Sequence, residues 1–309
     1  MEKKGHDYEA DAQLLRKAMK GAGTDERAII KLVGNRSNAE RQEIIKYYKS
    51  CFGKDLVDDL ADELGGDLKK VVVGMFMKPA EFDAHELYYA MKGIGTDEDC
   101  LIEIIASRSN ERLKEIKKIF EEKYKKNLEE EVKDETSGSF RKLCISILQC
   151  NRDETSTIDW AKVQKDSKEL YDAGEGKWGT DESVFNRIFS LRSASHLAAL
   201  KKNYEQTYGI PLLKSIDNEF SGDIKKMLKA VVHVLTDPSD YFAERIYKAC
   251  KGWGTKDHRL IRILVSRDEV DMEQIKDSYE KKYGKQLLST IDDETGGDYK
   301  LMLLELAAH

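Results

Sequence analysis

The sequence predicts an all-α protein built as an array of four repeats, and three observations support this fold class. A short glycine-containing loop recurs four times along the 309 residues, at intervals of 72, 84 and 75 residues, and such recurrence indicates a repeat architecture. Apolar residues follow helical spacing in five segments of each repeat. Alternating apolar and polar residues, the pattern typical of strands, do not occur.

The repeats are expected to be joined by short polar segments. We predict a tail at 1–10, repeats at 11–78, 83–150, 166–236 and 241–308, and a linker at 151–165. The linker is rich in Ser, Thr and Asp, which favours a loop. We therefore expect it to divide the chain into two halves.

Five amphipathic helices are expected in every repeat. In the first repeat their apolar faces are Leu14/Leu15/Ala18, Ile29/Leu32/Val33, Ile44/Ile45/Tyr48, Leu56/Val57/Leu60 and Leu68/Val71/Val72/Met75. In the fourth repeat the corresponding faces are Phe242/Ile246, Leu260/Leu264/Val265, Ile275/Tyr279, Leu287/Leu288/Ile291 and Leu301/Leu304.

The composition bounds the class of protein. Hydrophobic residues make up 40% and charged residues 36% of the chain, which is typical of a soluble helical protein. No apolar run is long enough to span a membrane and no classical signal peptide is visible, so we expect a cytoplasmic protein, with any export following an unconventional route. Five cysteines, an odd number with no C-x-x-C pair, favour reduced thiols.

The net charge of −6 opposes binding to nucleic acid or to an acidic bilayer by charge alone. We expect no nucleic-acid partner. Attachment to an acidic lipid would need a cation between the protein and the lipid.

The recurring loop has the form of a junction between two helices. Its first copy runs from Met19 to Thr24, and we expect Met19 to end one helix and Thr24 to be the N-cap of the next. The glycines between them can take positive φ, which lets successive carbonyl oxygens point the same way. Unpaired carbonyls at a helix C-terminus lie at its negative dipole end. Such a loop favours a hard cation.

Two further residues occur at a constant separation from the last glycine of each loop. Forty residues later stands a glutamate: Glu63, Glu135, Glu219 and Glu294. Thirteen residues later stands an arginine, which we expect to cap carbonyl groups at the end of the second helix: Arg36, Arg108, Arg192 and Arg267.

A glutamate carboxylate would complete an oxygen site with the loop carbonyls. Ca²⁺ suits such a site better than Mg²⁺, because it accepts 6–8 oxygen ligands in flexible geometry. A site with one net negative charge should bind Ca²⁺ weakly, with a dissociation constant of roughly 10⁻⁴–10⁻³ M. Open coordination positions could take a lipid phosphate, so that ion and membrane each strengthen the binding of the other.

The residue at the loop tip varies among the repeats. Alkyl and indole groups occur there, and tryptophan prefers the membrane interface, so we expect these residues to face lipid: Ala22, Ile94, Trp178 and Trp253. Trp160, in the linker, is expected to be packed.

With these residues in register, the sequence resembles the annexin family over about residues 11–308. The motif is K-G-X-G-T followed after 38 residues by an acidic residue, and it is present in four copies, of which the third, at 174–180, is looser. The resemblance implies a curved disc of four repeats with five helices each. It also implies reversible, Ca²⁺-dependent binding to acidic phospholipids such as phosphatidylserine, and it leaves self-association on the membrane open.

The resemblance further implies the Ca²⁺ ligands, which are three backbone carbonyls and one glutamate in each repeat. They are Met19, Gly21, Gly23 and Glu63; Met91, Gly93, Gly95 and Glu135; Gly174, Lys177, Gly179 and Glu219; and Cys250, Gly252, Gly254 and Glu294. The third loop departs from the motif by one extra residue. In the fourth repeat Lys256 replaces an acidic residue, which we expect to weaken that site.

Two other functions stay in view. One is a helical-repeat scaffold for protein partners, with vestigial loops. The other is a membrane-associated ion channel, whose polar lining the resemblance would place at Asp83, Glu86, Glu103, Arg108 and Arg262. We expect no enzyme, because no nucleophile elbow, P-loop or Cys/His pairing is present.

Overall fold

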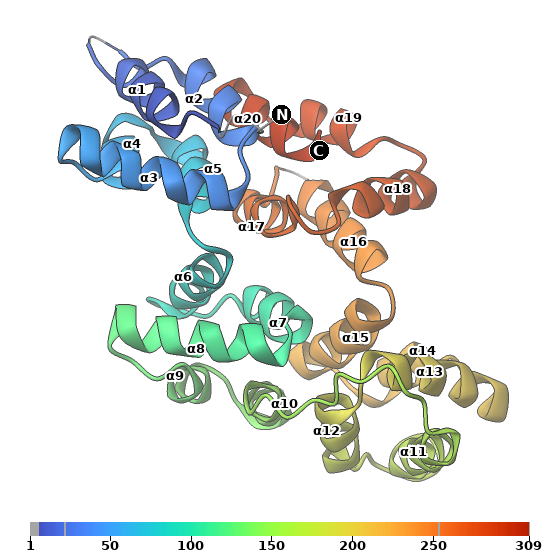
Figure 1. Ribbon diagram of the computed structural model, residues 1–309. Coiled ribbons are helices and arrows are strands. Elements are labelled where there is room, and N and C mark those ends of the chain that lie inside the picture. Colours follow the sequence, from blue (N-terminus) through green and yellow to red (C-terminus); the bar gives the residue numbers. More distant parts are fainter. Residues whose placement is uncertain (1–5, 22, 253, 309) are drawn as a thin grey trace, which may run out of the picture. The chain divides into compact units, whose positions relative to one another are not determined.

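The computed structural model describes residues 6–21, 23–252 and 254–308. This part of the chain forms twenty α-helices and contains no strand (Figure 1). Each repeat contributes five helices, which confirms the all-α prediction. The arrangement of the repeats as a curved disc stays a prediction.

The helices follow one another in the same order in each repeat. The first repeat contains α1 (Tyr8–Ala18), α2 (Glu26–Gly34), α3 (Asn38–Phe52), α4 (Leu56–Glu63) and α5 (Gly66–Phe76). The second contains α6 (Pro79–Met91), α7 (Glu98–Ser107), α8 (Asn110–Tyr124), α9 (Leu128–Glu135) and α10 (Gly138–Leu148). The third contains α11 (Trp160–Ala173), α12 (Glu182–Leu191), α13 (Ala194–Tyr208), α14 (Leu212–Glu219) and α15 (Gly222–Thr236). The fourth contains α16 (Pro238–Cys250), α17 (Asp257–Arg267), α18 (Met272–Tyr283), α19 (Leu287–Glu294) and α20 (Gly297–Ala307).

The chain divides into two compact units that are not its sequential halves. One unit joins Met1–Phe82 with Phe242–His309, and the other is Asp83–Tyr241. In the first unit α20 packs against α2 and α5, and in the second α15 packs against α7 and α10. The polar stretch 151–165 therefore lies inside the second unit, and the expectation that it separates two halves is wrong.

Three local expectations also need correction. Helix α1 already begins at Tyr8, within the stretch expected to be a tail, because the Asp7 side chain accepts the amide of Ala10 at 2.9 Å and caps the helix. Helix α11 likewise begins inside the expected linker, at Trp160. Trp160 is 57% exposed and not packed as expected.

The core of each unit consists of the apolar faces that the helical spacing marks. In the first repeat Leu15, Ile29, Ile44 and Val72 are fully buried. Burying a side chain of this size stabilises the fold by about 1.5–3 kcal/mol. Among the described residues, no helix is both long enough and apolar enough to cross a membrane.

The recurring arginine ties the end of the second helix of a repeat to the first helix. In three repeats its guanidinium pairs with a buried or nearly buried aspartate: Arg36 with Asp11 at 2.7 Å, Arg108 with Asp83 at 2.7 Å, and Arg192 with Asp166 at 2.6 Å. Each pair is a two-pronged contact, with two guanidinium nitrogens on two carboxylate oxygens. The expected carbonyl cap is thus mainly a carboxylate pair.

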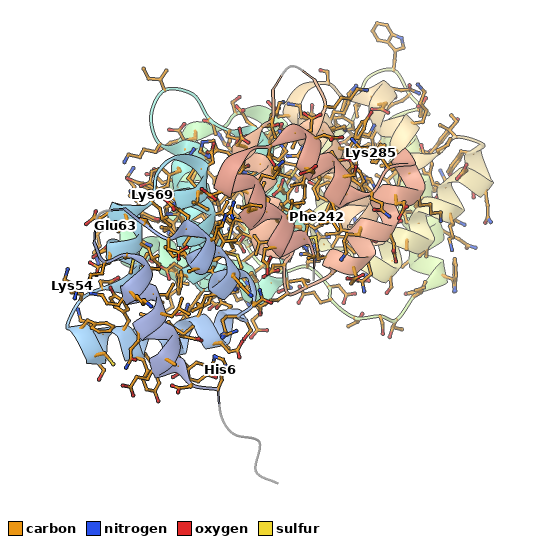
Figure 2. All side chains as sticks on the ribbon, turned by 90° about the horizontal axis from the view of Figure 1, so that it is seen from above. His6, Lys54, Glu63, Lys69, Phe242 and Lys285 are labelled. Atoms are coloured by element: carbon orange, nitrogen blue, oxygen red, sulfur yellow. The ribbon has the colours of Figure 1, made fainter. Side chains whose placement is uncertain are left out.

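In the fourth repeat the recurring arginine is held by different groups. Phe242, labelled in Figure 2, stands in the sequence of this repeat at the position that the aspartate has in the others. The Arg267 guanidinium lies 4.5 Å from the centre of the Phe242 ring, and it pairs with Asp271 at 2.7 Å. A cation over an aromatic face is a favourable contact, so this repeat keeps the anchor without the aspartate.

Candidate metal centres in four loops

Each recurring loop is closed at its base by one backbone hydrogen bond. The amide of the residue after the loop threonine donates to the carbonyl of the alanine that precedes the loop. The four pairs are Asp25 to Ala18 at 2.9 Å, Asp97 to Ala90 at 2.9 Å, Asp181 to Ala173 at 2.7 Å, and Lys256 to Ala249 at 2.8 Å. The backbone is therefore closed at the base of each loop.

The predicted N-cap, Thr24, is wrong by one residue. Asp25 caps α2, and its side chain accepts the amide of Ala28 at 3.0 Å. Asp97 and Asp181 cap α7 and α12 in the same way, whereas Lys256 provides no side-chain cap to α17. The aspartates leave the threonine hydroxyl available for another partner.

The glycines of the loops adopt backbone conformations that other residues rarely take. In the first loop φ is +123° at Gly21 and +101° at Gly23. The second and fourth loops repeat this pattern, with φ of +113° at Gly93, +87° at Gly95, +126° at Gly252 and +82° at Gly254. Glycine takes positive φ readily because it has no Cβ. Positive φ at two alternate residues gives their carbonyl groups directions that other residues rarely allow.

The third loop is built differently. Of its three glycines, Gly179 alone has positive φ, at +83°. The carbonyl of Gly174, one of the predicted ligands, accepts the amide of Lys177 at 2.9 Å. The additional residue of this loop is thus accommodated in a turn.

The glutamate 40 residues past each loop comes to the base of that loop. It is the last residue of the fourth helix of its repeat, and the glycine three residues later has a positive φ of +56° to +62° in all four repeats. Glu63, labelled in Figure 2, accepts the Thr24 hydroxyl on Oε2 at 3.0 Å. Glu135 accepts the Thr96 hydroxyl on Oε2 at 2.8 Å, and Glu219 accepts that of Thr180.

The fourth repeat lacks this contact between hydroxyl and carboxylate. Thr255 donates instead to the backbone carbonyl of Glu294, at 2.9 Å. In the third repeat the Glu219 side chain lies close to Gly174 of the loop. A Cβ added to Gly174 would lie only 3.0 Å from Cγ of Glu219. Glycine at this position lets the glutamate side chain pack directly on the loop.

Two loop tips are described, and both are fully exposed. Ile94 and Trp178 extend into solvent from the second and third loops, as expected for groups that could meet a lipid surface. The other two predicted tips, Ala22 and Trp253, lie outside the described residues.

Stacked tyrosines support three of the loops, and sequence reasoning missed them. Each pair joins the first and third helices of its repeat, with ring centres about 4 Å apart: Tyr88 with Tyr124, Tyr171 with Tyr208, and Tyr247 with Tyr283. Lys92 and Lys251, the loop lysines, lie over the rings of Tyr88 and Tyr247 at 5.4 and 5.3 Å. Aligning the repeats outside the loops would have found these positions.

A cavity of about 870 Å³ adjoins the third loop. Lys177 and Thr180 of the loop line it, together with Arg141 from α10 and the buried rings of Phe185 and Phe220. Basic side chains, the acidic Asp181 and Glu182 and apolar side chains thus share the lining of this cavity beside the loop.

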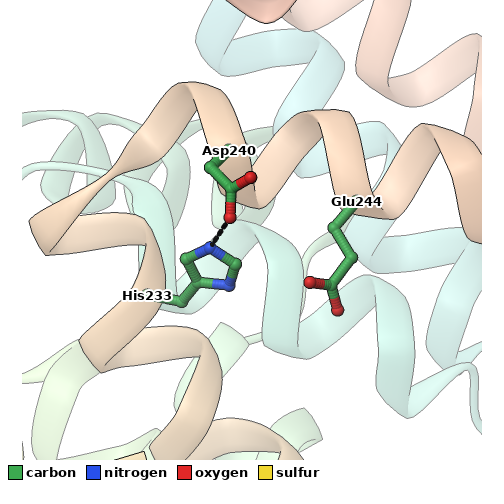
Figure 3. Close-up of side chains that lie close together, drawn as sticks. All are labelled: His233, Asp240 and Glu244. Atoms are coloured by element: carbon green, nitrogen blue, oxygen red, sulfur yellow. Dashed lines mark hydrogen bonds and ion pairs between the residues drawn. The ribbon is translucent and has the colours of Figure 1, made fainter. Parts of the chain in front are cut away.

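A histidine and an aspartate meet outside the loops. His233 and Asp240 share a hydrogen bond of 2.7 Å between Nε2 and Oδ2 (Figure 3). Glu244, one turn after Asp240 on α16, accepts hydrogen bonds from Lys248 and Lys282. Burial alone would raise the pKa of Glu244, but these two lysines lower it to about 2. Its charge is already balanced by the lysines.

Comparison with known proteins agrees with the repeat pattern. The family model for annexins matches residues 10–75, 82–147, 165–231 and 241–306. The chain belongs to the annexin family. It is 48% identical to rabbit annexin A11 over 302 residues, which are 98% of this chain and 60% of that protein. It is also 48% identical to mouse annexin A5 over 303 residues, or 98% of this chain and 95% of annexin A5.

The fold is also similar to that of solved annexin structures. A solved structure of annexin III superimposes with a TM-score of 0.97 at 38% identity, covering 100% of this chain and 96% of that one. Annexins are in general non-enzymatic proteins that bind Ca²⁺ and membrane phospholipids. The chain spans 60% of the length of the annexin A11 relative, so the activity of that longer protein does not transfer as a whole.

Proposed function

We propose that this annexin binds acidic phospholipid membranes when Ca²⁺ is present. In each repeat the ion would bridge loop carbonyl oxygens and one glutamate carboxylate on the protein to a phosphate of the lipid. The observation that carries this proposal is the contact between the loop threonine and the distant glutamate in three repeats. This contact supports the proposal, because each of these threonines directly follows a loop glycine with positive φ.

The donor set suits a hard cation. Backbone carbonyls and a carboxylate offer only oxygen, which Ca²⁺ prefers. Three carbonyls and a bidentate carboxylate would leave positions open for water and lipid phosphate among the 6–8 that Ca²⁺ fills. In the third loop the ion would share the Gly174 carbonyl with the Lys177 amide.

The surroundings of the loops favour an acidic membrane over a neutral one. The exposed side chains of Ile94 and Trp178 would enter the interface, where indole groups are favoured. The basic residues around the cavity beside the third loop, among them Arg141 and Lys177, would attract an acidic headgroup such as phosphatidylserine. All five cysteines are free thiols, in keeping with a role in the reducing cytoplasm.

Vesicle co-sedimentation tests the proposal. Protein is mixed with vesicles of phosphatidylcholine alone or with phosphatidylserine, in Ca²⁺ or in chelator. We expect pelleting only with phosphatidylserine and Ca²⁺ together. The control is a variant in which all four glutamates are glutamine, and it should stay in the supernatant while keeping its helical circular dichroism. Equal pelleting of both proteins, or pelleting in chelator, would contradict the proposal.

A further inference from the structure

We propose that Thr24, Thr96 and Thr180 are positioning residues that hold the ion-binding glutamate of their repeats in place, and that the fourth loop lacks this device. The inference rests on the proposed Ca²⁺ binding and assigns to the hydroxyl a role apart from the ligands. It predicts that the four sites differ in Ca²⁺ affinity for a reason outside their ligand sets.

The hydroxyl is well placed for this role because its backbone is fixed. The amide of the next residue closes the loop on the alanine before it in every repeat. The N-cap position is filled by Asp25, Asp97 or Asp181. The threonine is therefore not needed to cap the helix, and its hydroxyl donates across to Oε2 of the glutamate.

Holding the carboxylate matters because a glutamate side chain is flexible. Three rotatable bonds let an unheld glutamate spread over many rotamers, and ordering it on ion binding lowers the affinity. A hydroxyl that donates one hydrogen bond removes much of this freedom beforehand. It occupies one lone pair of Oε2 and leaves Oε1 and the second lone pair of Oε2 for the ion.

The fourth loop provides an internal contrast. It has the same glycine conformations as the first and second loops and the same glutamate at the end of the fourth helix. Its threonine, however, donates to the backbone carbonyl of Glu294 and not to the carboxylate. The same residue type at the same position thus does not restrain the carboxylate there.

The two loops that carry a tryptophan at the tip allow a matched experiment. In one parent protein Trp160 and Trp253 are replaced by Phe, so that Trp178 reports on the third loop. In the other parent Trp160 and Trp178 are replaced, so that Trp253 reports on the fourth. Tryptophan fluorescence is titrated with Ca²⁺ in the presence of phosphatidylserine vesicles at one fixed concentration.

We expect Thr180→Val to raise the Ca²⁺ midpoint about threefold to tenfold, which is the size of a typical net hydrogen bond. Thr180→Ser keeps the hydroxyl and should stay within about twofold of its parent. Thr255→Val, in the other parent, should also stay within about twofold, because no carboxylate contact is lost there. Thermal unfolding without Ca²⁺ is measured for each variant to separate positioning from a general loss of stability.

A double-mutant cycle with Glu219→Gln completes the test, since residues in contact show non-additive effects. In the Gln background, Thr180→Val should shift the midpoint by less than about twofold. Equal midpoints for the Val and Ser variants, in a parent that responds to Ca²⁺, would overturn the inference alone. A tighter midpoint for Thr180→Val would do the same. A parent without any Ca²⁺ response would overturn both this inference and the proposed function.

Discussion

The fourth repeat differs from the first three in the partner of the recurring arginine, in the N-cap of the second helix and in the partner of the loop threonine. Phe242 stands where the others have an aspartate that pairs with the recurring arginine. Lys256 stands where the others have an aspartate as N-cap. Thr255 bonds a backbone carbonyl where the others bond a carboxylate. Yet it has five helices as the others do, and its loop glycines match those of the first and second repeats.

This comparison distinguishes contacts that different side chains can make from features that all four repeats share. The arginine anchor can be made from a carboxylate or from an aromatic ring, because both attract a guanidinium. The closing hydrogen bond and the positive φ of the last loop glycine have no such substitute, since all four loops share both. We therefore expect substitutions at the variable positions to have effects that depend on the repeat.

The largest expected effect is the loss of the buried pair in the third repeat. Asp166 is 1% and Arg192 13% exposed, so Asp166→Asn would leave a nearly buried guanidinium without its counter-charge. We expect the free energy of unfolding to fall by about 3–5 kcal/mol, measured by urea denaturation. The matched change in the fourth repeat, Asp271→Asn, should cost about 1–2 kcal/mol, because Arg267 keeps the Phe242 ring. Equal losses would show that the ring does not replace the aspartate.

The same pair gives the stability a pH dependence. Burial alone would raise the pKa of Asp166, but Arg192 and His196 outweigh it and hold the pKa well below its usual range. A carboxyl with a lowered pKa contributes fully above its unfolded pKa, and the contribution is lost as the pH falls further through the folded pKa. Below about pH 4 the wild type should therefore lose more stability than Asp166→Asn. Urea midpoints at pH 6 and pH 3 check this, and parallel losses would argue against it.

A smaller effect is expected from removing one carboxylate at a time. Glu219→Gln keeps the size of the side chain and removes its charge, so the Ca²⁺ needed for half-maximal vesicle binding should rise about tenfold, or about 1.4 kcal/mol. Glu294→Gln should have less effect, because that carboxylate is not held by its threonine. Helical circular dichroism should not change in either variant. A loss of helix in Glu219→Gln would identify the residue as structural.

The smallest effect should come from giving the fourth repeat the missing cap. Lys256→Asp would supply a side-chain acceptor at the N-terminus of α17, as Asp25 does for α2. We expect Tm to rise by about 2 °C, the size of one N-cap in a chain of this length. Differential scanning calorimetry measures the change, with Lys256→Ala as a control that removes the lysine without adding a cap. Equal Tm values for both would count against the cap.

Much of the fold could be predicted from the sequence because it depends on local patterns. The apolar spacing around Leu15, Ile29 and Ile44 marks helices whose buried faces are those residues, since a helix puts every third or fourth residue on one side. The approach of Glu63 to its loop followed from the constant separation in four copies. These predictions needed no knowledge of how the repeats pack.

The sequence could not predict which residue caps a helix or which group pairs with an arginine, because several chemically equivalent partners were available. Thr24 and Asp25 are both good N-caps, and only the folded structure shows that Asp25 caps α2 while Thr24 bonds Glu63. Arg192 could bond carbonyl groups or a carboxylate, and the position of Asp166 on the neighbouring helix settles the choice.

The sequence by itself determined the helices, the four loops and the glutamate that belongs to each, because local spacing and internal repetition specify them. Only the tertiary structure decided that repeats one and four form one compact unit and repeats two and three the other. It also decided that Thr255 does not hold Glu294. A difference of this kind depends on the direction of one hydroxyl group, and the threonine and glutamate that all four repeats share do not reveal it.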